Sequence, residues 1–260
     1  MPTEKPALEL VNTLIMLEQA GIPLDDFGNS LLELSMVDQY THFDLMNEFS
    51  TTGNSPLGLH GIDHTVRVVF WVLYLVEISN RLGYRISEDE ALAAMYAALV
   101  HDLTREDDLP GGAHGQAAAR KYREVLRGHL EPDMLERCMT AVEWHGYDEN
   151  PALPDPVWML LKDADALDRA RLAPPGVMDG CDPDRLRLPV LRENPTLIDA
   201  CLTISMLLTT LLTLYEVKTG IFRYMTLTFA EILLAESAAE PEPFQQAVHL
   251  ITDRLTPAPA

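Results

Sequence analysis

The sequence predicts an all-α fold, and three observations support this prediction. Hydrophobic residues recur three and four positions apart, as in residues 7–20, where they would share one face of a helix. Helix boundaries carry typical signals: Gly21 and Pro23 follow this first segment, and Ser87 with Glu90 three positions later forms a capping-box pattern. Alternating runs of β-branched residues between hairpin turns, which would predict strands, are absent from the sequence.

The same signals place the other helices in order along the chain. We expect helices over 7–20, 28–49, 60–81, 87–101, 114–128, 132–145, 156–171, 195–218, 225–236 and 242–254. Residues 50–59 and 103–113 are rich in Gly, Pro and polar residues and are expected to be loops. Because nothing marks a linker, we expect residues 1–260 to form a single α-helical domain.

Length and charge limit the classes of function. A chain of 260 residues with 47% hydrophobic residues can bury a substantial core. Forty acidic against nineteen basic residues give a net charge of -21, which repels polyanions, and no basic stripe is visible. We therefore expect no nucleic-acid partner. A small anionic substrate stays compatible with this charge, because a bound divalent metal and a few arginines can reverse the local potential.

Cysteine spacing and hydropathy indicate a cytoplasmic protein without a membrane partner. Cys138, Cys181 and Cys201 are far apart and odd in number, which argues against a disulfide framework. The N-terminus lacks the basic and apolar regions of a signal peptide. The apolar segment 197–214 includes Asp199 and several hydroxyl residues, so we expect a core helix or a homo-oligomer interface there instead of a membrane span.

Histidines and aspartates recur in apolar, helical surroundings. His64 lies near the start of one apolar segment, and the His101-Asp102 doublet ends another. Asp163 and Asp165 lie on a third apolar segment. Burying such groups without a partner is costly, so a shared partner is expected. A mixed His and carboxylate set suits a divalent metal such as Mn, Fe, Co, Ni or Zn.

The order of these residues resembles the HD superfamily of metal-dependent phosphohydrolases. The resemblance covers about residues 56–172 and implies an HD-type helical bundle, with extra helices at both ends of the chain. It implies that His64 (in HTVRV) is the first metal ligand and that His101 and Asp102 (in AALVHDL) are the signature doublet. It further implies that Asp163 (in LKDADALDR) is the closing ligand.

Two more histidines decide between one metal ion and two. In HD proteins with two metals, histidines between the doublet and the closing aspartate supply the second site. The resemblance would give this role to His114 and His145, with Asp102 bridging the two ions. The alternative is that His114 caps a helix or contacts phosphate, while His145 lies in a wet groove. One or two ions are both compatible with the sequence.

Charged residues near the doublet and the closing aspartate are candidates for catalysis together with Asp102. Arg105 could grip a phosphate through its guanidinium fork, and Lys162 could make a similar contact. Asp107 or Asp108 could orient water or act as general acid or base. Acidic residues in a polar loop are also commonly just solvated.

Other polar residues could support the ligands. Asp165 and Asp168 could hold ligating histidines in the correct tautomer. His60, four positions before His64 on the same expected helix face, could support the metal, touch substrate or hydrogen-bond a loop.

The leading functional prediction is hydrolysis of a phosphate ester or anhydride in a small molecule, such as a nucleotide. One alternative is a di-iron oxygenase, a chemistry that some HD relatives perform. A second is hydrolysis of a signalling nucleotide, although the GYP triplet of the cyclic-dinucleotide branch is missing after the doublet and Glu106-Asp107 matches the alarmone branch only loosely. A third is a non-catalytic binding protein, which the intact ligand set disfavours because unused buried His and Asp are a liability.

Overall fold

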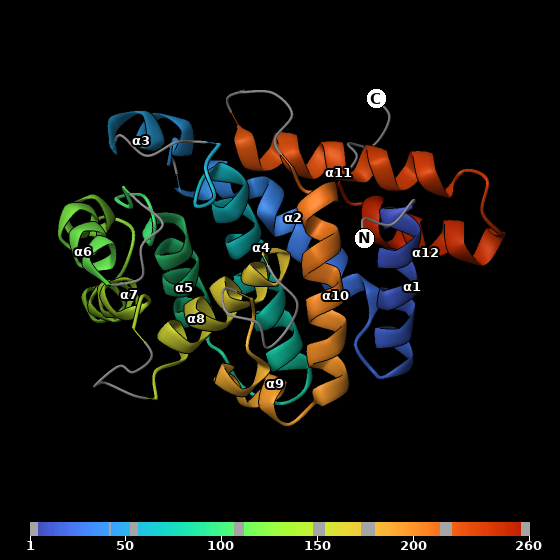
Figure 1. The fold of residues 1–260 in the computed structure, drawn as a ribbon, viewed down its shortest axis with the longest axis horizontal. Helices are drawn as coiled ribbons and strands as arrows, with labels where there is room; N and C mark the ends of the chain where they lie inside the picture. The colour runs from blue at the N-terminus through green and yellow to red at the C-terminus, as the bar shows by residue number, and fades with distance from the viewer. Residues whose placement is uncertain are drawn as a thin grey trace.

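The structure, a computed structural model, describes residues 5–41, 43–52, 57–106, 112–147, 154–172, 180–213 and 220–255. These residues form twelve α-helices and two short 3-10 helices, with no strand among them, which confirms the all-α prediction (Figure 1). The first helices are α1 (Pro6–Gln19), α2 (Leu24–Thr41), α3 (Leu45–Thr52), α4 (Ile62–Arg81) and α5 (Glu88–Val100). Then follow α6 (Ala113–Leu126), α7 (Pro132–Trp144), α8 (Pro156–Asp168), η1 (Arg169–Arg171) and η2 (Pro183–Arg185). The last helices are α9 (Pro189–Arg192), α10 (Pro195–Leu211), α11 (Ile221–Ser237) and α12 (Glu242–Thr252).

Helix α4 occupies the centre of the molecule and packs against α2, α5 and α8. It is central because it is apolar on nearly all sides, and a helix without a polar face is stable only when surrounded. In Figure 1, α6 and α7 lie on one side of this centre, and α1, α11 and α12 lie on the other. The polar residues at the ends of α4, α5 and α8 are therefore brought together inside the fold.

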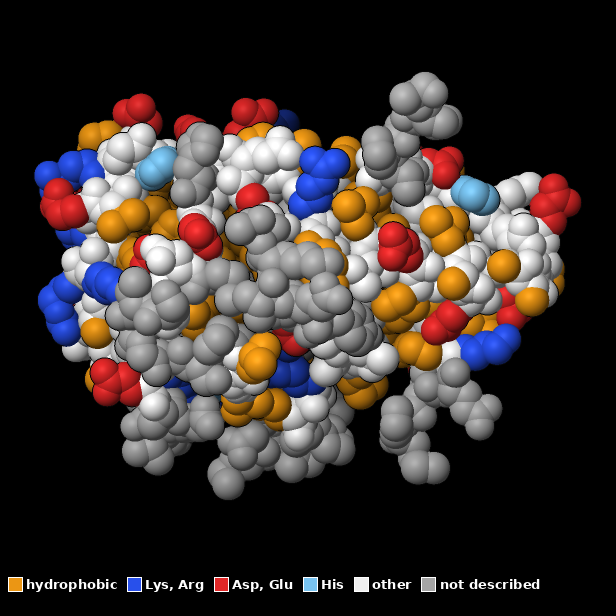
Figure 2. Space-filling model, turned by 90° about the horizontal axis from the view of Figure 1, so that it is seen from above, with side chains coloured by type: hydrophobic (Ala, Val, Ile, Leu, Met, Phe, Trp, Pro, Cys, Tyr) orange, Lys and Arg blue, Asp and Glu red, His pale blue; other side chains and the backbone are white. Residues whose placement is uncertain are grey.

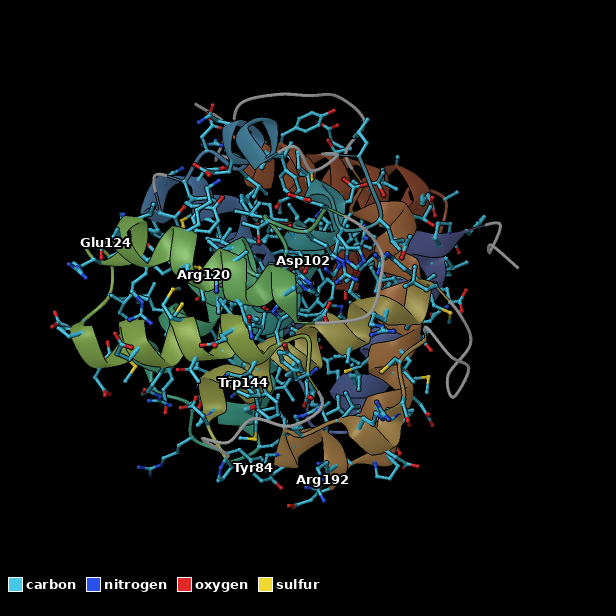
Figure 3. All side chains as sticks on the ribbon, turned by 60° about the vertical axis from the view of Figure 1, so that its left-hand side comes forward. Tyr84, Asp102, Arg120, Glu124, Trp144 and Arg192 are labelled. Carbon is cyan, nitrogen blue, oxygen red and sulfur yellow. The ribbon has the colours of Figure 1, made fainter. Side chains whose placement is uncertain are left out.

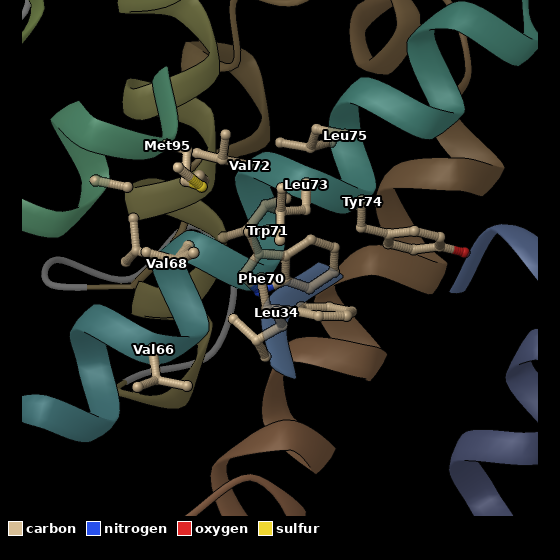
Figure 4. Close-up of a cluster of buried hydrophobic side chains, with 14 of the residues drawn as sticks. Leu34, Val66, Val68, Phe70, Trp71, Val72, Leu73, Tyr74, Leu75 and Met95 are labelled. Atoms are coloured by element: carbon tan, nitrogen blue, oxygen red, sulfur yellow. The ribbon is translucent and has the colours of Figure 1, made fainter. Parts of the chain in front are cut away.

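Aromatic side chains fill the core on one side of α4 (Figure 4). The ring of Phe27 from α2 meets Phe70 and Tyr74 edge-on, with centroids 5.1 and 5.3 Å away. The indole of Trp71 donates to Ser205 of α10 at 3.0 Å, and Ser205 donates in turn to the carbonyl of Leu167 in α8 at 2.6 Å. This buried chain ties α4, α10 and α8 together just behind the polar cluster.

The N- and C-terminal helices form an added layer. Helix α10 lies against α1, and α11 packs on α2 and α12. The expected core helix at 197–214 corresponds to α10, which buries Cys201 and Ile204 while Met206 is exposed. Among the described residues, every helix is too short or too polar to cross a membrane. On the face seen in Figure 2, exposed hydrophobic side chains stand between acidic and basic ones.

Several helix boundaries differ from the sequence prediction. The expected helix over 28–49 is two helices, because Thr41 Oγ1 donates to the carbonyl of Val37 and accepts from the amide of Phe43, which ends α2 locally. Helix α4 begins at Ile62, two residues after His60, so His60 is not on its face as expected.

Candidate metal centre

Polar side chains from five helix ends converge on one buried cluster. In Figure 3, Asp102 lies beside the start of α6, and Arg120 and Glu124 follow farther along that helix. The cluster contains His60 before α4, His64 in the first turn of α4, His101 and Asp102 after α5, His114 in α6, His145 after α7 and Asp165 in α8. Four of the six ligands implied by the resemblance are buried to 3% exposure or less within it: His64, His101, Asp102 and His145.

Three of the histidines have their tautomer set by a neighbouring acceptor. Nδ1 of His101 lies 2.8 Å from the carbonyl of Ala98, and Nδ1 of His145 lies 2.6 Å from the carbonyl of Val142. A carbonyl only accepts, so both rings carry their hydrogen on Nδ1. Their Nε2 atoms face the cluster with a lone pair.

His64 follows the same pattern with a carboxylate as acceptor. Its Nδ1 lies 2.7 Å from Oδ2 of Asp168, and its Nε2 lies 3.2 Å from Nε2 of His101. When both rings are neutral, two lone pairs face each other across this gap. Such a contact is unfavourable unless a proton lies between the two nitrogens or a metal cation lies beside both. The Nε2 atoms of His114 and His145 form a similar pair at 2.9 Å.

Asp102 lies between the two histidine pairs. Its Oδ2 is 3.5 Å from Nε2 of His64 and 3.6 Å from Nε2 of His101. On the other side, Oδ1 is 3.1 Å from Nε2 of His114 and 3.2 Å from Nε2 of His145. The carboxylate therefore has one oxygen for each of two donor sets.

These distances suit bound divalent cations. Two atoms that each lie about 2.1 Å from one ion are roughly 3.0 to 3.4 Å apart in octahedral or tetrahedral geometry. The donor atoms of three groups lie within 4.8 Å of one another: His60, His64 and Asp102; His64, His101 and Asp165; and His101, Asp102 and His145. The buried His and Asp groups thus fit a divalent metal without large rearrangement.

The electrostatics of the cluster also favour a cation. Burial alone would lower the pKa of His64, but hydrogen bonds with Asp102 and Asp168, and the charge of Asp168 and Asp165, raise that pKa to about 9. Burial lowers the pKa of His101 to about 4, so this ring stays neutral. Burial opposes ionisation of Asp102, yet its neighbouring histidines hold its pKa well below the usual range. A field that holds a proton on a buried histidine also attracts a metal ion.

Asp168 supports His64, as expected, and Asp168 is itself held by two arginines that the sequence pattern did not indicate. Its carboxylate accepts from Nε of Arg67 at 2.6 Å and lies 2.8 Å from Nη1 of Arg171. Burial would raise the pKa of Asp168, but Arg67 and His64 lower it far below the usual range. Arg67 comes three residues after His64, a spacing that puts both on one helix face and could have revealed the role.

The structure corrects the prediction for Asp163. Its carboxylate accepts the amide hydrogens of Arg187, 2.9 Å from each oxygen, and of Leu188 at 2.7 Å. It therefore anchors the segment before α9, and none of the candidate metal-holding groups found among the described residues includes it. Asp165, two residues on, reaches the cluster, with Oδ1 3.4 Å from Nε2 of His64. A shift of two residues rotates a side chain to the opposite face of a helix, which explains the error.

The predicted charged residues lie at the edge of the cluster or outside the described chain. Nη1 of Arg105 is 3.7 Å from Oδ1 of Asp102 and 3.4 Å from Nε2 of His114. Nζ of Lys162 donates to the carbonyl of His145 at 2.6 Å. Asp107 and Asp108 lie outside the described residues, so their predicted roles stay predictions.

Fold and cluster together define a helical protein with a His and Asp centre suited to divalent metal. The comparison with family models assigns the class: residues 61–170 match the HD domain, so this part of the chain is an HD domain. The match runs from the residue before α4 into η1 and confirms the resemblance seen in the sequence. Comparisons with curated proteins and with solved structures gave no match.

Proposed function

We propose that this protein is a metal-dependent phosphohydrolase that acts on a small phosphorylated molecule, in particular a nucleotide. The HD domain supports this proposal, and one observation carries it: Asp102 has one carboxylate oxygen near each of two histidine pairs whose Nε2 atoms face each other. A divalent ion held there would lower the pKa of water and polarise a phosphoryl oxygen.

The residues around the cluster would serve the rest of the reaction. Asp102, His64 and His101 are positioned from helix ends in the core, so they hold their places without substrate. Arg105 lies within 4 Å of Asp102, and its guanidinium fork would contact a phosphate bound there. The positive charges of Arg105 and Lys162 would offset charge that develops on the phosphate.

The test begins with metal content and ends with substrate turnover. Purified full-length protein is stripped of metal, reloaded with Mn, Fe, Co, Ni or Zn, and assayed for phosphate release from a panel of nucleotides. We expect turnover with at least one ion and its loss in Asp102→Ala, with helical content unchanged by circular dichroism. The matched control is His249→Ala on α12, whose side chain is 57% exposed. Activity that survives in Asp102→Ala would contradict the proposal.

A di-iron oxygenase is a second candidate, because both donor sets around Asp102 are present. His114 and His145 give the Oδ1 side two nitrogen donors, which a one-ion centre does not need. Oxygen consumption by protein loaded with two irons, together with failure to release phosphate from any nucleotide tested, would favour this function instead.

A further inference from the structure

His60 lies immediately before the residues that match the HD domain, yet its ring belongs to the cluster. Nδ1 of His60 is 2.7 Å from Oδ2 of Asp102, the oxygen on the His64 side. The rings of His60 and His64 meet edge-on, with centroids 5.3 Å apart. The side chain of His60 is only 15% exposed, whereas a solvated histidine such as His249 is 57% exposed. The side chain of His60 is therefore part of the buried His and Asp cluster.

The backbone that carries His60 is fixed by the same arginine that supports His64. Nη2 of Arg171 donates to the carbonyl of Leu59 at 2.6 Å, while Nη1 of Arg171 lies 2.8 Å from Oδ2 of Asp168. The amide of Gly61 also donates to the carbonyl of Gly58 at 2.9 Å, which closes a turn around His60. A side chain held this way keeps its donor atom in place, as ligating residues require.

We propose that Nδ1 of His60 is a ligand of the ion that His64 and Asp102 bind, additional to the residues of the matched HD domain. This inference rests on the proposed function, because it needs a metal at the centre. The donor atoms of His60, His64 and Asp102 lie within 4.8 Å of one another, as ligands of one ion do. Nε2 of His64 cannot bind two ions, so His60 joins the ion shared by His64, His101 and Asp165.

The added nitrogen changes which metal the site prefers. With His60, His64 and His101, the ion would have three imidazole ligands besides the carboxylates of Asp102 and Asp165. Imidazole favours Fe, Co, Ni and Zn, whereas carboxylates and water favour Mg and Mn. The site should therefore bind Co²⁺ more tightly than Mn²⁺, and His60 should contribute to that difference.

The test measures Co²⁺ and Mn²⁺ binding to metal-free, full-length protein, with no assay of turnover. His60→Asn is the informative variant, because its amide can still donate to Asp102 but offers no imidazole nitrogen; His60→Ala removes both. We expect both variants to lose about tenfold or more in Co²⁺ affinity, with a smaller loss for Mn²⁺ and a changed Co²⁺ absorption spectrum. His249→Ala should match the wild type.

The possible outcomes test the role of His60 separately from the proposed metal-dependent function. If His60→Asn binds Co²⁺ with wild-type affinity and spectrum, His60 only hydrogen-bonds Asp102 and the inference fails while the metal centre stands. If the wild type binds neither ion, the proposed function fails as well. If His60→Asn does not fold, proton NMR of the Co²⁺-loaded wild type decides: a coordinated His60 ring has strongly shifted resonances, and an unshifted His60 overturns the inference.

Discussion

The carboxylate of Asp168 accepts the Nδ1 hydrogen of His64 at 2.7 Å, and this contact determines which nitrogen of His64 faces the candidate metal centre. Asp168 is fully buried, and its carboxylate forms ion pairs with Arg67 and Arg171. His64 is thus oriented by a carboxylate, and that carboxylate is oriented by two arginines. Interactions of this kind typically change metal affinity ten- to a hundredfold.

Asp168→Asn should weaken both folding and metal binding. The amide leaves two buried guanidinium groups without a matching charge, and removing one partner of a buried ion pair costs about 3 to 5 kcal/mol. We expect a loss of that order in urea unfolding and a ten- to hundredfold weaker Co²⁺ affinity in the protein that remains folded. Asp199→Asn, an exposed position on α10, is the control and should change neither. An unchanged affinity would mean that Asp168 does not orient His64.

Asp163→Asn and Asp165→Asn should have opposite effects. Asp163 accepts amide hydrogens from Arg187 and Leu188, and an amide NH₂ group in place of one oxygen would face these donors. Leaving buried donors unsatisfied costs about 1 to 3 kcal/mol, so Asp163→Asn should unfold at lower urea with metal affinity kept. Asp165→Asn should lose metal affinity and keep most of its stability. The reverse pattern would restore Asp163 as the ligand expected from the sequence.

The sequence was sufficient for the fold class and for most of the histidines at the site. Periodicity and capping signals act over a few residues, so the helix at 87–101 was placed to within one residue of α5 at each end. The doublet His101-Asp102 is informative because a buried helix rarely ends in two polar groups without a partner. These features are local, and local sequence determines them.

The sequence could not determine contacts that depend on the tertiary structure. Asp163 and Asp165 carry the same functional group and lie on the same helix. Their roles differ because the amides of Arg187 and Leu188 lie on the Asp163 side of α8. The sequence predicts His60 on a helix face, but His60 lies before α4. There Arg171, from a distant part of the chain, donates to the carbonyl of the adjacent residue Leu59. Such roles follow from packing between segments that are separated in the sequence, by 24 residues for Asp163 and Arg187 and by 112 for Leu59 and Arg171.

Ser87→Ala should reduce stability without affecting the metal centre. Ser87 accepts from the amide of Glu90 at 3.2 Å, and Glu90 accepts from the amide of Ser87 at 2.9 Å, which is a complete capping box at the start of α5. Loss of an N-cap costs about 1 kcal/mol. The centre lies at the other end of α5, so Co²⁺ affinity should stay at the wild-type value. A large loss of affinity would show that the position of His101 depends on the start of the helix.

Gly115→Ala should affect the second donor set of Asp102 more than the first. A Cβ atom at Gly115 would lie 2.5 Å from the carbonyl oxygen of Val142 and 3.0 Å from the ring of His145, closer than van der Waals contact allows. That carbonyl also accepts the Nδ1 hydrogen of His145. Overpacking of this kind typically costs about 1 to 3 kcal/mol, and it should move His145 away from Asp102.

The measurement for Gly115→Ala is stepwise Co²⁺ titration, which resolves a first and a second ion. We expect the second binding step to weaken or vanish while the first, held by His64 and His101, is nearly unchanged. Gly128→Ala is the matched control, because a Cβ atom there would meet nothing within 4 Å. If both steps weaken equally in Gly115→Ala, His145 does not belong to a separate site. If the wild type binds one ion and Gly115→Ala binds it normally, the centre is mononuclear and the histidines near Oδ1 of Asp102 serve the substrate instead.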